Sequence, residues 1–358
     1  MNSRIFLDVN AVQRLAPFVR RHFPGHRIVI ITDTRVQRLH ARIIAQSLIA
    51  HRLHVRCFAV PPGERSKTRE AKSALEDKLI AGRFGRDTLI IAVGGGVVGD
   101  LAGFVAATYM RGVPYIQVPT TLVSQTDSAI GGKVGVDSPW GKNLIGAFHA
   151  PAAVFIDPTL LCTLPCGEVR QGLVEMVKHG LIAEPSLARA IARRAAILTT
   201  PQHPRFVRTL FPLLRRSIRI KRGIVAHDPL ETNGQRAVLN YGHTFGHAIE
   251  QASRYRVAHG DAVAIGMTRA AEVAVRRGLL SQAAAAEQTR ILSAIGAPTA
   301  LPQGMNPAAL LKIMERDKKA RNHTPCFVLL KGLGHPIVHI DSKQLRSQRI
   351  ENRTDLAL

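Results

Sequence analysis

The first 150 residues alternate short runs rich in β-branched residues with stretches of helical periodicity. The apolar runs lie at residues 27–32, 54–60, 88–93, 115–118 and 153–156. Between them, residues 36–50 and 68–81 space their apolar positions as an amphipathic helix does. This alternation predicts a parallel sheet covered by helices on both faces, because parallel strands need crossover connections.

The character of the chain changes after Pro158. Alanine- and arginine-rich stretches with a period near 3.6 occupy residues 168–182, 185–198, 206–225, 243–253 and 261–278. Residues 326–330 and 336–340 predict a small late pair of strands. We therefore expect an N-terminal Rossmann-like parallel-sheet α/β domain over residues 1–158, followed by a mainly α-helical domain over residues 159–358. A length of 358 residues suits two domains.

The chain is strongly basic, with 49 Lys and Arg against 25 Asp and Glu, a net charge of +24. Such a charge favours anionic partners, either nucleic acid or phosphorylated metabolites. Aromatic residues make up only 5%, and we find no helix-turn-helix, zinc-finger or RNA-binding motif. Solvated helix faces are the simpler explanation of the excess charge, so we expect a small-molecule substrate and no nucleic-acid partner.

Neither a membrane nor a disulfide framework is expected. The longest apolar stretch, residues 89–99, is too short to span a bilayer. The beginning MNSRIFLDVN shows no basic-then-apolar signal pattern, which predicts a cytoplasmic protein. The four cysteines lack the C-x-x-C spacing of a zinc or redox site.

A glycine-rich turn follows the third predicted apolar run. Residues 94–99 read GGGVVG, which satisfies G-x-G-x-x-G between a strand and an alanine-rich helix. Such a turn lets the backbone and a helix N-terminus approach a pyrophosphate. No acid follows about twenty residues downstream, where the usual dinucleotide motif has one. Asp33 and Glu64 are candidates for a ribose-binding carboxylate, and each is equally suited to cap a helix.

A second motif has the residue types of a metal site. His243 and His247 are four residues apart on one expected helix face, and His259 follows in HGD. Upstream, Glu175 and Lys178 share a helix face by their spacing of three. Three nitrogen or oxygen ligands with an open position are typical of a catalytic divalent metal. Spacing alone leaves open whether His247 is a ligand or an acid/base group.

Residues 109–148 are unusually rich in polar groups for a stretch inside a domain. Cationic side chains beside glycines and small polar residues are how proteins hold phosphates and carboxylates. The stretch is therefore a candidate anion-binding centre, as opposed to a polar surface loop. Its candidate residues are Arg111, Thr120, Thr121, Asp127, Lys133, Lys142 and Asn143.

Together these segments resemble a known family. GGGVVGDLAGFVAATYMRG, VPTTLVSQTDSAIGGKVGVD, GKNLIGAFHAP, GLVEMVKHG, LNYGHTFGHAIE and HGDAVAIGM are similar to the corresponding segments of 3-dehydroquinate synthase, a sugar-phosphate cyclase of the shikimate pathway. The resemblance runs from about residue 33 to residue 331, with the motifs in the family's order. It implies an NAD-binding α/β domain, a helical metal-binding domain and a homodimer.

The resemblance also implies roles for individual residues. Glu175, His243 and His259 would bind Zn²⁺ or Co²⁺, and His247 would be an acid/base or substrate-positioning group. Arg111 would reach the phosphate of the neighbouring subunit's substrate. The implied NAD contacts are Asp33, Glu64, Lys67, Gly95, Gly96, Val97, Val98, Gly99, Asp100, Thr120, Thr121, Asp127, Lys133, Lys142 and Thr163. The implied substrate contacts are Asp127, Lys133, Asn143, Lys178, Lys221, Arg236, Asn240 and either Lys318 or Lys319.

The implied reaction converts 3-deoxy-D-arabino-heptulosonate 7-phosphate to 3-dehydroquinate and phosphate. NAD would be reduced and reoxidised within one turnover, and the protein would mainly orient the substrate and stabilise charge. Two positions depart from the family pattern: Arg35 stands where an Asn is usual, and the run containing Glu231 is one residue longer. Arg35 puts the adenosine contacts and the choice of cofactor in doubt, since an arginine can accommodate a 2′-phosphate.

Two related functions compete with this expectation. Another sugar-phosphate cyclase would bind a substrate without a carboxylate, whereas Lys221, Arg236 and Asn240 fit a carboxylate binder. A metal-dependent polyol dehydrogenase would share the glycine turn and the metal, but it would lack the substrate lysines and would release NADH.

Overall fold

The computed structural model describes residues 3–315 and 326–341. Within the chain, two compact units are distinguished, Met1–Pro165 and Cys166–Leu358. The sequence placed the boundary at residue 158, and the short helix η6 (Pro158–Thr163) belongs to the first unit. Lys318 and Lys319, expected near the substrate, lie outside the described residues.

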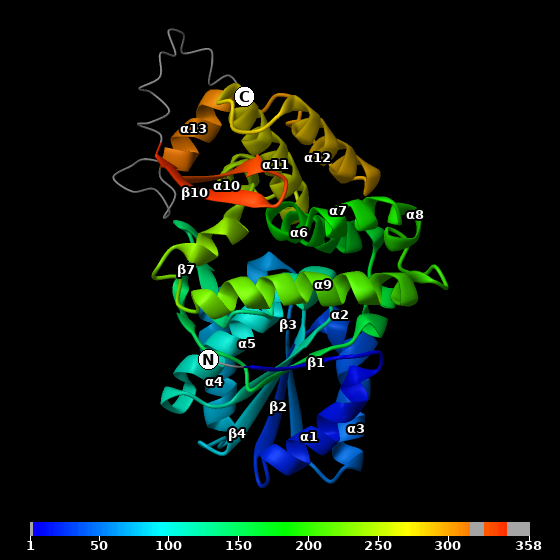
Figure 1. Ribbon diagram of the computed structural model, residues 1–358. Helices are drawn as coiled ribbons and strands as arrows, with labels where there is room; N and C mark the ends of the chain where they lie inside the picture. Colours follow the sequence, from blue (N-terminus) through cyan, green and yellow to red (C-terminus); the bar gives the residue numbers. More distant parts are fainter. Residues whose placement is uncertain (1–2, 316–325, 342–358) are drawn as a thin grey trace. The chain divides into compact units, whose positions relative to one another are not determined.

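The first unit is built on a six-stranded sheet with the order β1-β8-β5-β4-β2-β3, in which all pairings are parallel (Figure 1). This confirms the predicted parallel sheet. The edge strand β1 was not predicted, because it is short and only partly buried. The strands are β1 (Arg4–Leu7), β2 (Arg27–Asp33), β3 (Val55–Val60), β4 (Thr88–Gly94), β5 (Tyr115–Pro119) and β8 (Ala153–Ile156).

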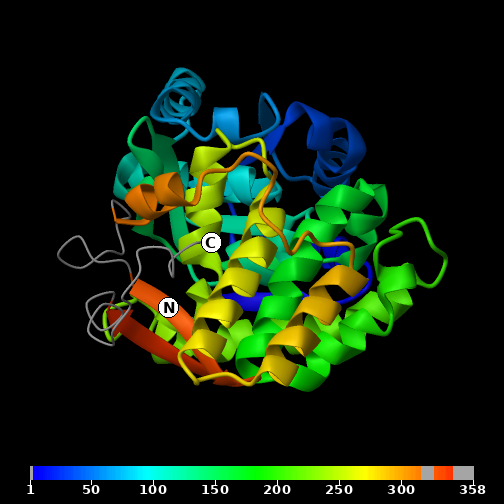
Figure 2. The ribbon, with the colours of Figure 1, turned by 90° about the horizontal axis from the view of Figure 1, so that it is seen from above.

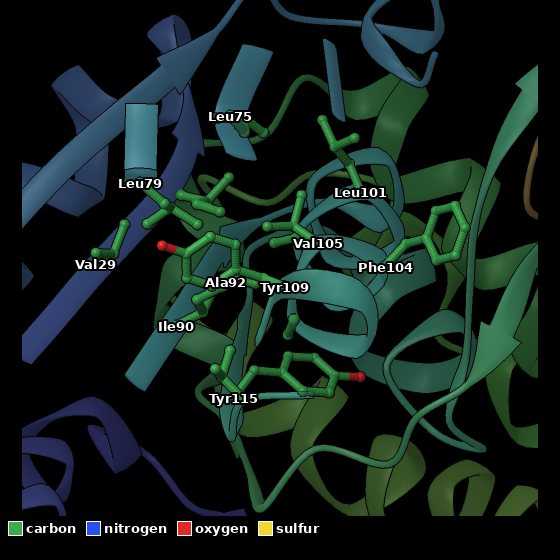
Figure 3. Packing of buried hydrophobic residues seen from close by; sticks show 14 of the residues in the cluster. Val29, Leu75, Leu79, Ile90, Ala92, Leu101, Phe104, Val105, Tyr109 and Tyr115 are labelled. Carbon is green, nitrogen blue, oxygen red and sulfur yellow. The ribbon is translucent and has the colours of Figure 1, made fainter. Parts of the chain in front are cut away.

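Alternate residues of each central strand enter two separate cores. Val29 and Ile90 pack with α4 (Arg69–Ala81) and α5 (Gly96–Thr108) on one face (Figure 3). Ile28 and Leu89 pack with α1 (Leu15–His22) and α3 (Arg42–Ala50) on the other face. Because successive side chains of a strand point to opposite faces, a strand covered on both sides must be apolar throughout. That is why the predicted strands appear as unbroken apolar runs.

Several short segments complete the first unit. The helix predicted over residues 36–50 is interrupted by a π-helical turn, η2. The helix predicted over residues 68–81 begins one residue later, because Thr68 is its N-cap and accepts a hydrogen bond from the amide of Ala71. The short segments are η1 (Ala11–Arg14), α2 (Thr34–Val36), η2 (Gln37–Ala41), η3 (Glu64–Ser66), η4 (Tyr109–Arg111) and η5 (Ser124–Ser128).

The polar stretch expected to bind anions folds partly into an antiparallel hairpin, β6 (Lys133–Ser138) with β7 (Gly141–Phe148). Gly135 and Gly146 lie opposite each other in this hairpin. A Cβ atom at Gly146 would lie 2.1 Å from the carbonyl oxygen of Val134, and one at Gly135 would lie 2.5 Å from that of Ile145. Glycine is therefore required at both positions, where the strands approach closely.

The second unit is mainly helical, as predicted, and its helices lie side by side with a small hairpin along them (Figures 1 and 2). The stretch predicted as one helix over residues 185–198 is two helices, α7 and α8. The predicted late strand pair is confirmed as β9 (Cys326–Gly332) and β10 (His335–Asp341). The helices are α6 (Cys166–Ala183), α7 (Pro185–Ala192), α8 (Ala195–Leu198), α9 (Phe206–His227), η7 (Gln235–Asn240), α10 (His243–Ala252), α11 (His259–Arg276), α12 (Gln282–Ala294) and α13 (Pro307–Glu315).

Over the described ranges, none of the helices is both long and apolar enough to cross a membrane.

Candidate functional site

One carboxylate and two imidazoles from three helices of the second unit converge. Glu175 lies in the middle of α6, while His243 and His259 are the first residues of α10 and α11. Oε1 of Glu175 lies 3.4 Å from Nε2 of His259 and 3.8 Å from Nε2 of His243. The three ligand atoms all lie within 4.8 Å of one another. One oxygen and two nitrogens at this spacing are a suitable donor set for a divalent cation.

Glycines allow α10 and α11 to approach closely enough for the two histidines to meet. A Cβ atom at Gly266 would lie 2.0 Å from the carbonyl oxygen of Gly242, and one at Gly246 would lie 3.3 Å from the backbone of Ala262. Gly242 itself has a φ of +80°, which favours glycine, directly before His243. The sequence NYGHTFGH thus uses its glycines for helix contact and for the turn that begins α10.

Buried charged groups surround this cluster. Glu175 is fully buried, and its Oε2 forms an ion pair with Nζ of Lys178, one turn along α6. Burial, aided by the charge of Lys178, holds the pKa of His243 well below its usual range, so its nitrogen is neutral and able to bind a metal. Burial also opposes a charge on His259, but hydrogen bonds to Glu175 and Glu250 raise its pKa to about 10. In the protein without metal, His259 therefore carries a proton that a divalent cation would displace.

Glu250 is a member of this region that the sequence analysis missed. It lies on α10 and is 2% exposed, and its Oε2 accepts a hydrogen bond from Nδ1 of His259 at 3.3 Å. A carboxylate on the far nitrogen of a histidine fixes the ring's tautomer and orientation toward a metal. The available signal was its spacing, since Glu250 follows His243 by seven residues and His247 by three on the same helix.

His247 lies beside the cluster. Its ring centroid is 5.4 Å from that of His243 and 6.4 Å from that of His259. His247 is not a member of the group in which the ligand atoms of Glu175, His243 and His259 all lie within 4.8 Å of one another. This geometry favours an acid/base or positioning role for His247 over a role as a ligand.

Three further residues expected to hold substrate belong to segments of the second unit that pack together. Lys221 lies on α9, and Arg236 and Asn240 lie on η7, which contacts both α9 and α6. Lys221 and Arg236 are 6% and 4% exposed, which is unusual for cations unless they are paired. Nη1 of Arg236 donates to the carbonyl oxygen of Pro229 at 3.0 Å.

The glycine turn of the first unit lies between β4 and α5, as predicted. Gly94 ends the strand, Gly95 is the N-cap of α5, and neither a side-chain cap nor an acidic residue lies in the helix's first turn. A helix N-terminus of this kind is suited to binding an anion. Gly99 has a packing role, since a Cβ atom there would lie 2.9 Å from Oε1 of Gln117. Val97, Val98 and Asp100 follow in the first turns of α5.

Asp33 is the last residue of β2 and Glu64 follows β3, so both lie at the carboxyl ends of parallel strands, where ligands bind to such sheets. Asp33 is a helix cap: its Oδ1 accepts hydrogen bonds from the amides of Arg35 and Val36 at 2.8 and 2.9 Å. Glu64 begins η3, and its Oε1 lies 3.5 Å from Nζ of Lys142. Capping through Oδ1 leaves the second oxygen of Asp33 available for a further contact.

Lys67 links three segments that lie apart in the sequence. Its side chain is 5% exposed, and Nζ lies 2.6 Å from Oδ2 of Asp100 and also donates to Oδ1 of Asn143. The charge of Asp100 raises the pKa of Lys67 even though burial opposes it. The backbone N–H of Asn143 donates to Oδ1 of Asp137 at 2.9 Å. Lys67 therefore attaches the β6–β7 hairpin to the helix of the glycine turn.

The remaining expected contacts of the first unit follow other strands. The amide of Thr120 donates to the carbonyl oxygen of Gly94 at 2.9 Å, which places it beside the glycine turn. Oγ1 of Thr121 accepts from the amide of Ser124 at 3.1 Å. The hydroxyl of Thr163 lies 2.9 Å from Nε2 of His40, so η6 is tied to the segment after β2. Asp127 lies in η5, and Lys133 begins β6 with an exposed side chain.

Arg111 does not join these groups. It follows the opposite end of α5, and a helix of 13 residues spans roughly 20 Å. Arg111 is exposed and has a φ of 68°, in the left-handed region. Arg111 therefore lies far from the glycine turn of its own chain.

Comparison with known proteins assigns the chain to a group of enzymes. It is similar over 96% of its length, with a TM-score of 0.85 and 27% identity, to 94% of a 2-deoxy-scyllo-inosose synthase solved with carbaglucose-6-phosphate, NAD⁺ and Co²⁺. The fold is that of the sugar-phosphate cyclases.

Residues 57–171 match the family model for the 3-dehydroquinate synthase N-terminal domain, and residues 172–320 match that for the C-terminal domain. The 3-dehydroquinate synthase of Desulforamulus reducens is 41% identical over 95% of this chain and 94% of its own length. That of Symbiobacterium thermophilum is 39% identical over 94% and 93%. The chain belongs to the 3-dehydroquinate synthase family.

Proposed function

We propose that this chain catalyses the reaction of its family, as a carbon–oxygen lyase that uses NAD and a divalent metal. It would convert 3-deoxy-D-arabino-heptulosonate 7-phosphate to 3-dehydroquinate and phosphate. The observation that carries the proposal is the convergence of Glu175, His243 and His259 within a unit that also buries Lys178, Lys221 and Arg236. Buried cations suit a substrate that bears both a carboxylate and a phosphate.

The residues of both units fit the two cofactors. Glu175, His243 and His259 would hold Zn²⁺ or Co²⁺, because their donor atoms converge and Glu250 orients His259 from behind. The uncapped N-terminus of α5 would hold the pyrophosphate of NAD, and the second oxygen of Asp33 would reach its ribose. When bound, NAD supplies reversible hydride acceptance and the metal supplies Lewis acidity at a substrate hydroxyl.

The chain's own residues then act by binding and orientation. Lys178 would share its proton donors between Glu175 and a substrate oxygen, and Lys221, Arg236 and Asn240 would bind the carboxylate. Lys133, Asn143 and Asp127 would bind the polar groups of the substrate. His247 would hold or pass a proton at the substrate, close to the metal but outside its ligand set.

We also propose a homodimer in which each subunit contributes Arg111 to its partner's substrate phosphate. Support comes from the position of Arg111, which is exposed at the end of α5 remote from the glycine turn of its own subunit.

The experiment is phosphate release from 3-deoxy-D-arabino-heptulosonate 7-phosphate with catalytic NAD, before and after chelation and metal restoration. We expect release that needs metal and sub-stoichiometric NAD, without net NADH. Accumulation of NADH with polyols would instead identify a dehydrogenase. Release from a sugar phosphate lacking a carboxylate, but not from this substrate, would identify a different cyclase.

A further inference from the structure

The first turn of α11 is held in place by α6. Its N-cap is Ala258, whose side chain cannot accept a hydrogen bond, and the N-cap residue therefore leaves the first amides of α11 unpaired. Instead, Oε1 of Gln171 accepts hydrogen bonds from the amides of Gly260 and Asp261, the latter at 3.2 Å. Gln171 is 6% exposed, so these amides are satisfied by a buried side chain from another helix.

A second contact reinforces the first. Arg170 forms a two-pronged ion pair with Asp261, Nε to Oδ1 at 3.0 Å and Nη2 to Oδ2 at 2.8 Å. Gly260 permits the close approach, since a Cβ atom there would lie 2.8 Å from both the Cα and the carbonyl oxygen of Gln171. The backbone directly after His259 is thus fixed to α6 through both its amides and a side chain.

These contacts lie one helical turn from the candidate metal ligand on α6. Gln171 precedes Glu175 by four residues, so both project from the same face of that helix. Gln171 holds the amide that follows His259, while Glu175 meets the ring of His259 at 3.4 Å. The face of α6 that carries Glu175 therefore also fixes the backbone next to His259.

We propose that Gln171, assisted by Arg170, is a positioning residue for His259 and thereby sets the affinity and geometry of the metal centre. This inference rests on the proposed metal-dependent function. Without the acceptor at position 171, the buried amide of Gly260 and the partly buried amide of Asp261 lose their partner, and α11 shifts to expose them. His259 then leaves the spacing that brings its Nε2 to Glu175.

The test uses full-length protein stripped of metal and titrated with Co²⁺, followed by its visible absorption spectrum and by competition with a chelator. Gln171→Met keeps the length of the side chain without an acceptor. We expect at least roughly 10-fold weaker Co²⁺ binding and changed absorption bands. Gln171→Glu keeps the accepting oxygen, so its affinity and spectrum should return close to those of the unchanged protein.

Ser281→Ala is the matched control. It removes the N-cap of α12, a helix that carries no member of the cluster, so Co²⁺ binding should be unchanged. If Gln171→Met does not fold, Arg170→Gln replaces it, because that side chain is 33% exposed and its loss leaves fewer buried groups unpaired. A severalfold weaker Co²⁺ affinity is then expected.

The outcomes separate the two proposals. If the unchanged protein binds no Co²⁺, the metal centre itself is refuted. If the unchanged protein binds Co²⁺ and a folded Gln171→Met or Arg170→Gln variant has the same affinity and spectrum, the metal centre stands and the positioning role is overturned.

Discussion

Oε1 of Glu175 lies 3.4 Å from Nε2 of His259, although the two residues belong to different helices and different sequence motifs. Each has a second partner: Glu175 forms an ion pair with Lys178, and His259 donates a hydrogen bond to Glu250. A group of donors fixed in this way needs little rearrangement to accept a cation.

Replacing Glu175 by Gln should weaken metal binding most severely. The amide keeps the size of the side chain but removes the negative charge that faces both histidines. We expect divalent metal affinity to fall by more than about 100-fold and phosphate release to fall with it. Equilibrium dialysis against Zn²⁺ measures the first effect. Unchanged metal content in a folded variant would remove Glu175 from the metal site.

Replacing Glu250 by Gln should weaken the metal site without abolishing it. The variant loses the charged acceptor of the hydrogen bond from Nδ1 of His259. Affinity should fall by about 10- to 100-fold, and activity should recover at high metal concentration. Glu287→Gln is the matched control, because Glu287 pairs with Arg189 at the surface. Equal effects from both substitutions would rule out a specific role for Glu250.

Replacing Lys67 by Met should destabilise the first unit. The substitution leaves Asp100 without its ion-pair partner and releases Asn143 of the β6–β7 hairpin. Because Lys67 is almost fully buried, we expect the free energy of unfolding in urea to fall by about 3 kcal/mol. Adding Asp100→Asn should restore part of that loss.

Lys72→Met is the control for this experiment. Lys72 pairs with Glu76 one turn along α4 and lies over the ring of Phe104; because both charged side chains are partly exposed, we expect its loss to cost only about 1 kcal/mol. A Lys67 variant no less stable than the Lys72 variant would contradict the linking role of Lys67.

Asp228 should make the loop before Arg236 sensitive to acid. Its carboxylate accepts hydrogen bonds from the amides of Thr232, Asn233 and Arg236. Burial opposes the charge, but these amides hold the pKa of Asp228 below its ordinary value. The stabilisation is therefore complete above about pH 4, the pKa in the unfolded chain, and is lost as the pH falls through the lowered pKa.

Asp228→Asn tests this dependence. The variant should be less stable at pH 7, and its stability should fall less between pH 5 and pH 3 than that of the unchanged protein, as measured by urea unfolding. The KM for substrate should rise as well, because the loop positions Arg236. Parallel stability profiles for the two proteins would show that Asp228 does not titrate in this way.

Mixed dimers test the proposed exchange of Arg111. Arg111→Ala and Lys178→Ala proteins should each be nearly inactive alone. A dimer of one of each would contain one complete site, built from the Lys178 of one subunit and the Arg111 of the other. We expect activity to return on mixing after subunit exchange. If mixing restores none, although mixed dimers are shown to form, Arg111 does not act in its partner's site.

The sequence by itself determined the parallel sheet, the helical second half and the ligand types of the candidate metal site. These follow from local patterns: apolar runs that suit strands buried on both faces, periodic helices, and histidines at a helical spacing. The same local information revealed the glycine turn between β4 and α5. The sequence could not decide whether Asp33 caps a helix or binds a ribose, because each role uses the same carboxylate.

The tertiary structure alone decided which groups support the candidate sites. The ion pair of Lys67 with Asp100, the hydrogen bond of Glu250 to His259, and the capping of α11 by Gln171 each join segments with no pattern in common. Contacts of this kind depend on how helices pack, and glycines such as Gly260 and Gly266 permit that packing by letting backbones approach. Periodicity identifies the face of a helix that is buried but not its neighbour, and the neighbour determines the chemistry of the site.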